Sequence, residues 1–138
     1  MFLTPHNAWP DTEKVAVAWL TQQMDDVADL TVCTETGPLI TPPTIRVQRV
    51  PGGGGIQDGI EDLSLLDVEC FGGNRDQMWA IARRANAEMI NLKWQTVAGS
   101  TIDEVVNING LGEVEYNDPL IRRAIATYEL TARVQATV

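Results

Sequence analysis

The sequence predicts an α+β fold in which two helices pack on one face of a mainly antiparallel β-sheet. Two segments carry apolar residues at helical spacing, and several others alternate apolar and polar residues as half-buried strands do. The strand-like segments mostly follow one another instead of alternating with helices, which favours antiparallel pairing. The 138 residues suit a single domain over 1–138, whose core is large enough to fold without a metal or a disulfide.

The first helix is expected over about residues 11–27. Asp11 is a favourable starting residue, and the apolar residues that follow recur at intervals that form one face. This face consists of Val17, Leu20, Met24 and Val27. Three aspartates near the C-terminal end oppose the helix dipole, so we expect the helix to fray around them. A short strand over 30–33 and a proline-rich loop over 34–43 should follow.

Two strands are expected next, on either side of a run of four glycines. Alternation predicts strands over 44–50 and 63–71, and in the second strand Asp67 and Glu69 point away from the apolar side chains. The glycine run, Gly52–Gly55, has high backbone entropy and no side chains to pack. We therefore expect a flexible loop over about 51–59.

The second helix gives the clearest helical pattern in the chain, over 74–92. Its apolar residues recur at intervals of three and four, and Asn74 is a suitable N-cap. Downstream, two short strands flank Asn109–Gly112, a sequence typical of a hairpin turn.

The last segment, 123–135, predicts one long strand. Apolar residues occupy its even positions, and polar residues hold most odd ones. Three of the apolar residues are alanines, which implies that a helix packs closely on that face. A strand of this length exceeds the usual 5–6 residues. If it lies at the edge of the sheet, its unpaired amides offer a way to continue the sheet across subunits.

The charge of the chain excludes a protein that grips DNA. The formal net charge is −9, and two stretches, 50–74 and 94–121, contain acids and no Lys or Arg. Binding to phosphates requires Lys and Arg that displace counterions. The acids either serve solubility or line a surface that DNA passes without sticking. The second interpretation makes four acids candidates for a channel-facing role, namely Glu61, Asp62, Asp67 and Glu69.

Catalytic and metal-binding patterns are not found in the sequence. His6 is the single histidine, and no serine lies in a GxSxG elbow. Cys33 and Cys70 lack zinc-site spacing and are expected to be free thiols, with a Cys33–Cys70 disulfide as the alternative. The glycine run is not followed by the GK[ST] of a phosphate-binding loop. We expect a protein that is not an enzyme and holds no metal or cofactor.

No apolar stretch approaches the roughly 20 residues of a membrane span, and the N-terminus has no signal-peptide pattern. The expectation is a soluble protein made in the cytosol. Among the four tryptophans, Trp19 and Trp79 are expected to pack between elements. Trp9 and Trp94 lie near predicted helix ends, where an exposed indole would suit a subunit contact.

The order of these segments resembles the tail terminator proteins of long-tailed, non-contractile siphophages. The resemblance rests on the helix opening Pro10–Val15, the strand Thr44–Val47 before the glycine run, and Leu66–Gly72 before a helix opening Asn74–Asp76. The chain closes with Asp118–Arg123 and the strand Ala126–Arg133. Together these features cover most of the chain.

The resemblance implies a structural virion protein and no catalytic residues. Such proteins form a hexameric ring on the last ring of the tail tube, stop its polymerisation and offer a docking face to head-completion proteins. The implied partners are a further copy of the chain, the major tail tube protein and a head-completion or stopper protein, with genomic DNA only as passing cargo and no membrane. The implied location is the head-proximal end of the virion tail, after assembly in the host cytoplasm.

The glycine-rich segment is then a candidate partner-contact loop that becomes ordered on docking. Its residues are Gly52, Gly53, Gly54, Gly55, Asp58 and Gly59. The alternative function is a head–tail stopper or connector protein of the neck.

Overall fold

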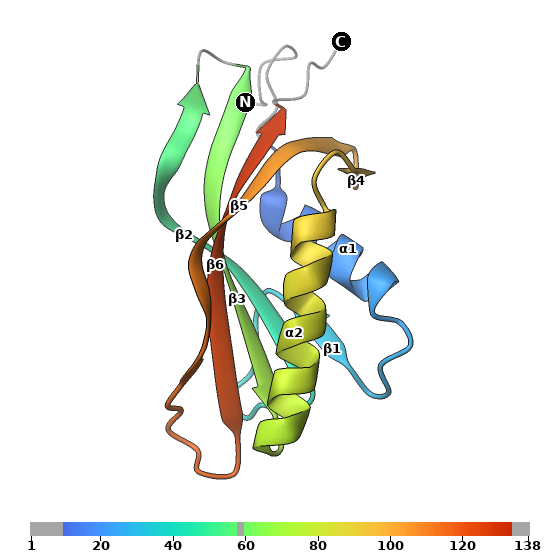
Figure 1. Cartoon of the computed structure of the whole chain (residues 1–138), viewed down its shortest axis with the longest axis vertical. Helices are drawn as coiled ribbons and strands as arrows, with labels where there is room; N and C mark the ends of the chain where they lie inside the picture. Colours follow the sequence, from blue (N-terminus) through green and yellow to red (C-terminus); the bar gives the residue numbers. More distant parts are fainter. Residues whose placement is uncertain (1–9, 58–59, 134–138) are drawn as a thin grey trace.

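The computed structural model describes residues 10–57 and 60–133 and contains two helices and six strands (Figure 1). In chain order the elements are α1 (Thr12–Gln23), β1 (Thr31–Cys33), β2 (Thr44–Gln57), β3 (Glu61–Gly72), α2 (Arg75–Asn91), β4 (Thr96–Val97), β5 (Ser100–Val114) and β6 (Arg122–Arg133). The α+β class is therefore as predicted. The strands form one sheet of order β1-β2-β3-β6-β5-β4.

The sheet is mixed, which corrects the expectation of a mainly antiparallel one. β1 pairs with β2 in parallel, and the other neighbours pair antiparallel. The parallel pair arises because the loop 34–43 leads the chain back to the start of β1, where Thr31 donates its N–H to the carbonyl of Pro43 at 3.2 Å. In the described part of the chain, no helix is long and apolar enough to cross a membrane.

Both helices bury side chains against the same face of the sheet. Val15 and Leu20 of α1 belong to one apolar cluster with Met78 and Met89 of α2, and the cluster includes β3 and β6 residues such as Leu66 and Leu130. Figure 1 shows α2 running along the sheet with α1 beside it. We call the opposite side of the sheet its outer face.

The start of α1 is as predicted, and two of the four residues of the predicted face, Leu20 and Met24, are fully buried, while Val17 and Val27 pack against the same core. The Asp11 side chain accepts the Lys14 N–H at 3.0 Å, and the helix ends at Gln23, before the aspartates that oppose its dipole. Val17 is half-buried and Val27 lies beyond the helix end. The buried residues of the helix are Thr12, Val15, Ala16, Trp19 and Leu20.

The second helix, α2, is confirmed from its first residue to its last turn. The Asn74 side chain accepts the Gln77 N–H at 2.8 Å, which satisfies one of the free amides at the helix start. Met78, Ala85 and Met89 are buried against the sheet. They lie at the intervals of a helical stripe.

The final strand lies in the middle of the sheet, and the idea that it continues the sheet across subunits is wrong. β6 pairs with β3 on one side and with β5 on the other. Its alternation is as predicted, because Ala124, Ala126, Leu130 and Ala132 are all buried. The long apolar alternation of β6 therefore reflects a central position, with strands on both edges and a helix on one face.

The predicted hairpin around Asn109–Gly112 does not form. The whole segment from Ser100 to Val114 is one strand, β5, paired with β6. The register shifts between Asn107 and Asn109 and again between Asn109 and Gly112. The turn-forming residues are accommodated as irregularities, because β6 offers a partner to β5 from Ile102 to Val114.

The glycine run is also part of a strand, which corrects the predicted loop over 51–59. β2 continues through Pro51 and the four glycines to Gln57. Its pairing with β3 breaks after Val50, opposite Leu65, and resumes at Gly55, opposite Leu63. The residues between form a bulge, which lets the strand bend while pairing continues beyond it.

Candidate interaction surfaces

The glycine run packs closely on β3: a side chain at Gly53 would overlap backbone, and one at Gly52 would have to displace the end of the Leu65 side chain. A Cβ on Gly52 would lie 2.8 Å from Leu65 Cδ1, and one on Gly53 would lie 2.8 Å from the backbone oxygen of Leu63. Both glycines have positive φ, +118° and +73°, which disfavours other residues as well. In the single chain, these glycines therefore cover Leu63 and Leu65.

The partner-contact role predicted for this segment stays a prediction. Gly52, Gly53 and Gly54 are exposed on their other side, and Gly55 is half-buried. Asp58 and Gly59 lie outside the described residues.

Of the four acids predicted to face a channel, Asp62 lies deepest. It is fully buried on the helix-covered face of the sheet. Its two oxygens accept from the two terminal nitrogens of Arg49, both at 2.8 Å. The Arg49 side chain keeps 34% of its surface exposed, so it connects the buried carboxylate to solvent. Such a fork-to-fork pair is the strong form of an ion pair.

Glu69 is buried on the outer face between two arginines. Arg46 donates to both of its oxygens at 2.9 and 3.1 Å, and Arg123 donates to one at 3.2 Å. The same arginines lie against aromatic rings, Arg46 over Phe71 and Arg123 over Tyr116, at 5.3 and 5.4 Å. Two cations thus neutralise one carboxylate, and the pKa of Arg46 is raised, chiefly by its hydrogen bonds to Glu69.

The other two acids are half-buried on the outer face. Asp67 accepts the Thr127 hydroxyl at 2.6 Å. Glu61 lies at the start of β3, opposite Arg133 of β6. A channel role for the four acids stays a prediction about an assembled state. In the single chain, Asp62 and Glu69 hold the fold together through their arginines.

The arginines around Glu69 also fix two loops that expose leucines. Arg46 donates to the Thr36 hydroxyl at 2.7 Å, and Arg123 donates to the Glu115 carbonyl at 3.1 Å. The loops carry Leu39 and Leu120, which are 84% and 79% exposed. A hollow of about 350 Å³ lies between the loops. It is lined by Pro38, Leu39, Ile40, Tyr116, Asn117, Asp118, Pro119 and Ile121.

The cysteines are free, so the alternative of a disulfide is wrong. Cys70 is buried in the core, and burial raises the pKa of its thiol to about 12. Burial also raises the pKa of the half-buried Cys33. A thiol needs its thiolate form to attack a substrate, so neither group is activated as a nucleophile. Among residues 10–57 and 60–133, no three His, Cys, Asp or Glu side chains gather where they could hold a metal. His6 lies outside the described residues.

The described tryptophans differ in burial as the sequence suggested. Trp19 is buried and donates its ring N–H to the Glu88 carbonyl at 2.7 Å, which joins α1 to α2. Trp79 is half-buried beneath Arg83. Trp94, just beyond α2, is 75% exposed. Trp9 lies outside the described residues.

The arginine pairs of Asp62 and Glu69 were not foreseen from the sequence. Arg49 and Asp62 lie on either side of the glycine run. Because nothing in the composition of this run indicates a bulge within a strand, the sequence does not show that the two residues meet. Arg46 and Glu69 are directly opposite each other in the β2–β3 register. Their opposite charges at alternating positions were the one available signal.

No protein-family model matches the chain, and no curated protein matches it. Among solved structures, the chain is similar to one described as "Virion of native gene transfer agent (GTA) particle", with a TM-score of 0.62 and 10% sequence identity. The match covers 91% of this chain and 99% of that one. At this identity the likeness shows a common fold, and it extends over nearly the whole of both chains.

Proposed function

We propose that this chain is a structural component of a phage-like particle, and that it acts there as the tail terminator. In that role it forms a hexameric ring on the last ring of the tail tube, ends tube polymerisation and offers a docking face to the head-completion proteins. The observation that carries the proposal is the whole-chain similarity in fold to a chain of a gene transfer agent virion. The order of elements that resembles tail terminators supports the finer assignment.

The use of the chain's reactive groups agrees with a structural role. Asp62 and Glu69 are held in ion pairs with arginines, and the Cys70 thiol is buried in the core. The exposed features are apolar side chains, including Leu39, Trp94 and Leu120. Exposed large apolar side chains are typical of protein contacts. The proposal includes no catalytic step and no cofactor.

The test is tube growth in vitro with the tube protein of the same particle. A terminator acts at tube ends, so it should shorten tubes at ratios far below one chain per tube subunit. Electron microscopy of stained samples gives the length distribution, and native mass spectrometry gives the number of copies in the ring. An equally acidic unrelated protein of similar size serves as the control.

Three outcomes separate the candidates. Shorter tubes with a ring at one end support the terminator assignment. Unchanged tube lengths, together with binding to head-side connector proteins, favour the head–tail stopper instead. A chain that stays monomeric in the presence of both tube and head-side proteins contradicts a structural virion role.

A further inference from the structure

The chain contains one Asn-Gly pair, Asn109–Gly110, within β5. An asparagine can react with its own backbone, because the amide nitrogen of the next residue can reach the side-chain Cγ and close a five-membered ring. Glycine obstructs this attack least, since it has no Cβ and the freest backbone. The pair that suggests a turn in the sequence is therefore also a candidate site of spontaneous chemistry, provided that the fold leaves it exposed and outside regular pairing.

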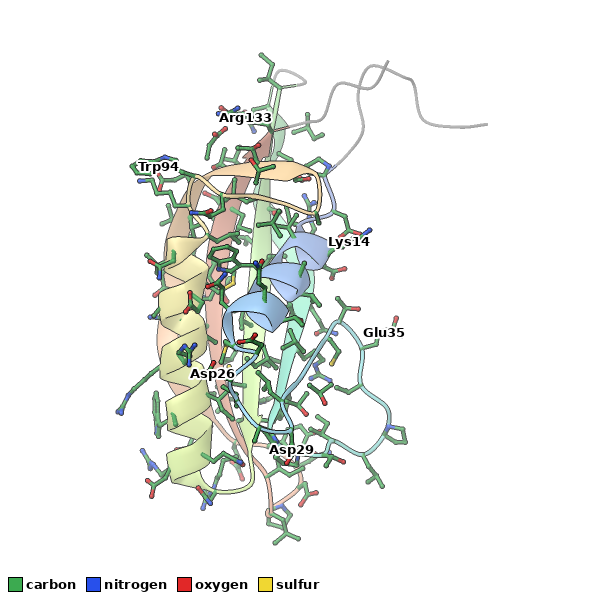
Figure 2. All side chains as sticks on the ribbon, turned by 90° about the vertical axis from the view of Figure 1, so that its right-hand side faces the viewer. Lys14, Asp26, Asp29, Glu35, Trp94 and Arg133 are labelled. Atoms are coloured by element: carbon green, nitrogen blue, oxygen red, sulfur yellow. The ribbon has the colours of Figure 1, made fainter. Side chains whose placement is uncertain are left out.

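β5 lies near the edge of the sheet, with β6 on one side and the short β4 on the other. Figure 2 shows its first part beside the end of α2, where Trp94 is labelled, and Figure 1 shows the rest running along the edge of the sheet. The pairing with β4 involves Ser100 and Thr101. In the described part of the chain, no strand therefore pairs with the outer side of β5 at Asn109.

The pair itself lies in an irregular part of this strand. Asn109 and Gly110 are both exposed. The register with β6 shifts between Asn109 and Gly112, so Gly110 lies in a bulge between two paired residues. Apart from its chain neighbours, a Cβ on Gly110 would meet nothing closer than Asn107 Oδ1, at 4.0 Å. The Asn109 side chain thus has room to approach the Gly110 nitrogen.

Two other exposed asparagines are held by hydrogen bonds that oppose the same reaction. Asn91 lies at the end of α2, where the N–H of the next residue, Leu92, donates to the Met89 carbonyl at 3.3 Å. Asn74 caps the start of α2, and its side-chain oxygen accepts the Gln77 N–H at 2.8 Å. In the first case the attacking nitrogen is held in a helix, and in the second the side chain is fixed. The pair in β5 has neither constraint among the side-chain hydrogen bonds of its asparagine and the turns of a helix.

We propose that Asn109 is a site of spontaneous deamidation in the folded chain. The Gly110 N–H gives its proton to solvent, and the nitrogen attacks Cγ of Asn109, so that a new C–N bond forms. The bond between Cγ and Nδ2 breaks, and the side-chain nitrogen leaves as ammonia after taking a proton from solvent. Water then opens the cyclic imide at either of its two carbonyls, which gives aspartate or isoaspartate. Nothing is oxidised or reduced, and water is the one co-reactant.

The modification changes both the charge and the backbone of β5. Either product carries a carboxylate, which is ionised at neutral pH and adds to the formal net charge of −9. Isoaspartate also places an additional CH₂ group in the main chain ahead of Gly110. The pairing of Gly112–Val114 with β6 then has to accommodate a longer backbone, so this end of β5 should loosen. The reaction needs only the chain and water, and it is independent of the proposed function.

The test is incubation of the folded, full-length chain at mildly alkaline pH, followed by digestion in acid and mass spectrometry of the peptides. Asn109 should be converted progressively, faster at higher pH because the Gly110 N–H must lose its proton, while Asn91 stays intact as the internal control. Isoelectric focusing should show a more acidic species. Methylation by a protein isoaspartyl methyltransferase should detect the isoaspartate product.

Gly110→Ala is the matched variant. Gly110 has no positive φ and has open space around a Cβ, so this variant should keep the Tm of the unaltered chain. The added methyl group hinders the attack of the nitrogen and should slow the loss of ammonia about tenfold, which corresponds to a barrier higher by about 1.4 kcal/mol.

A denatured sample of the same chain shows what the fold contributes. If Asn109 stays intact in the folded chain while the denatured sample is converted, the fold protects the pair and the proposal is overturned. Equal rates in Gly110→Ala and the unaltered chain overturn the cyclic imide as the route. The isoaspartate form, separated by ion exchange, should show faster hydrogen exchange at Gly112–Val114 than the unmodified chain. Equal exchange in the two forms overturns the predicted loosening of β5.

Discussion

The close packing of the glycine run predicts a graded series of stabilities for three Gly→Ala variants. Gly37 has open space around a Cβ and no positive φ. Gly55 has a φ of +63° and also has open space, so alanine there suffers only backbone strain. Gly53 has a φ of +73°, and its Cβ would lie 2.8 Å from the backbone oxygen of Leu63. The three variants separate conformational strain from steric overlap.

The expected magnitudes follow from these geometries. Gly37→Ala should change the free energy of unfolding by less than about 0.5 kcal/mol. Gly55→Ala should lose about 1–2 kcal/mol, the strain of a left-handed conformation with a Cβ. Gly53→Ala should lose about 3 kcal/mol, because overpacking against backbone adds to the same strain. For a domain of this size, roughly 4 °C of Tm corresponds to 1 kcal/mol.

Thermal unfolding followed by circular dichroism measures the series, at a protein concentration where each variant is monomeric. The expected order of Tm is Gly37→Ala, then Gly55→Ala, then Gly53→Ala as the lowest. Three equal melting temperatures would show that the run is a free loop, as the sequence alone suggests. They would refute the conclusion that it is a bulge fixed on β3.

Two further predictions concern buried groups. Arg49→Ala should lower the free energy of unfolding, measured in urea, by about 3–5 kcal/mol, because it leaves the buried Asp62 carboxylate without its ion-pair partner. Asp62→Asn should cost less, since the Arg49 side chain is partly exposed and can reach water; the reverse order would contradict the assigned burial. Burial raises the pKa of Cys70 from 9.0 to about 12, so the folded chain keeps a proton that the unfolded chain releases. The free energy of unfolding should therefore fall by about 2 kcal/mol between pH 8 and 10.5. Cys70→Ala should show a smaller fall, with a remainder from Tyr128, whose pKa burial also raises; an equal fall in both chains would exclude Cys70 as the cause.

The sequence predicts well those elements whose local residue pattern agrees with their burial in the fold. The helix after Asn74 has a cap, a buried stripe and two preceding glycines, and its bounds were found nearly to the residue. The strand from Arg122 to Arg133 alternates cleanly because a helix covers one of its faces. In both cases, local preference and burial agree.

The sequence fails where tertiary pairing overrides local preference. Gly52–Gly55 and Asn109–Gly112 both have the composition of turns, yet each lies inside a strand. The neighbouring strands, β3 and β6, pair on either side of these segments and hold them in the sheet through register shifts. The exposure of Trp94 was foreseen from its place after a helix.

The form of the sheet edges bears on how copies of the chain meet. Within residues 10–57 and 60–133, no strand pairs with the outer side of β2 beyond its short pairing with β1, or with the outer side of β5 beyond β4. Both open stretches are irregular, β2 at the glycine run and β5 at three register shifts. Bulges of this kind are a common way to protect an edge from pairing with another chain. Docking through side chains is therefore the mode of association that these edges favour over a continuous sheet.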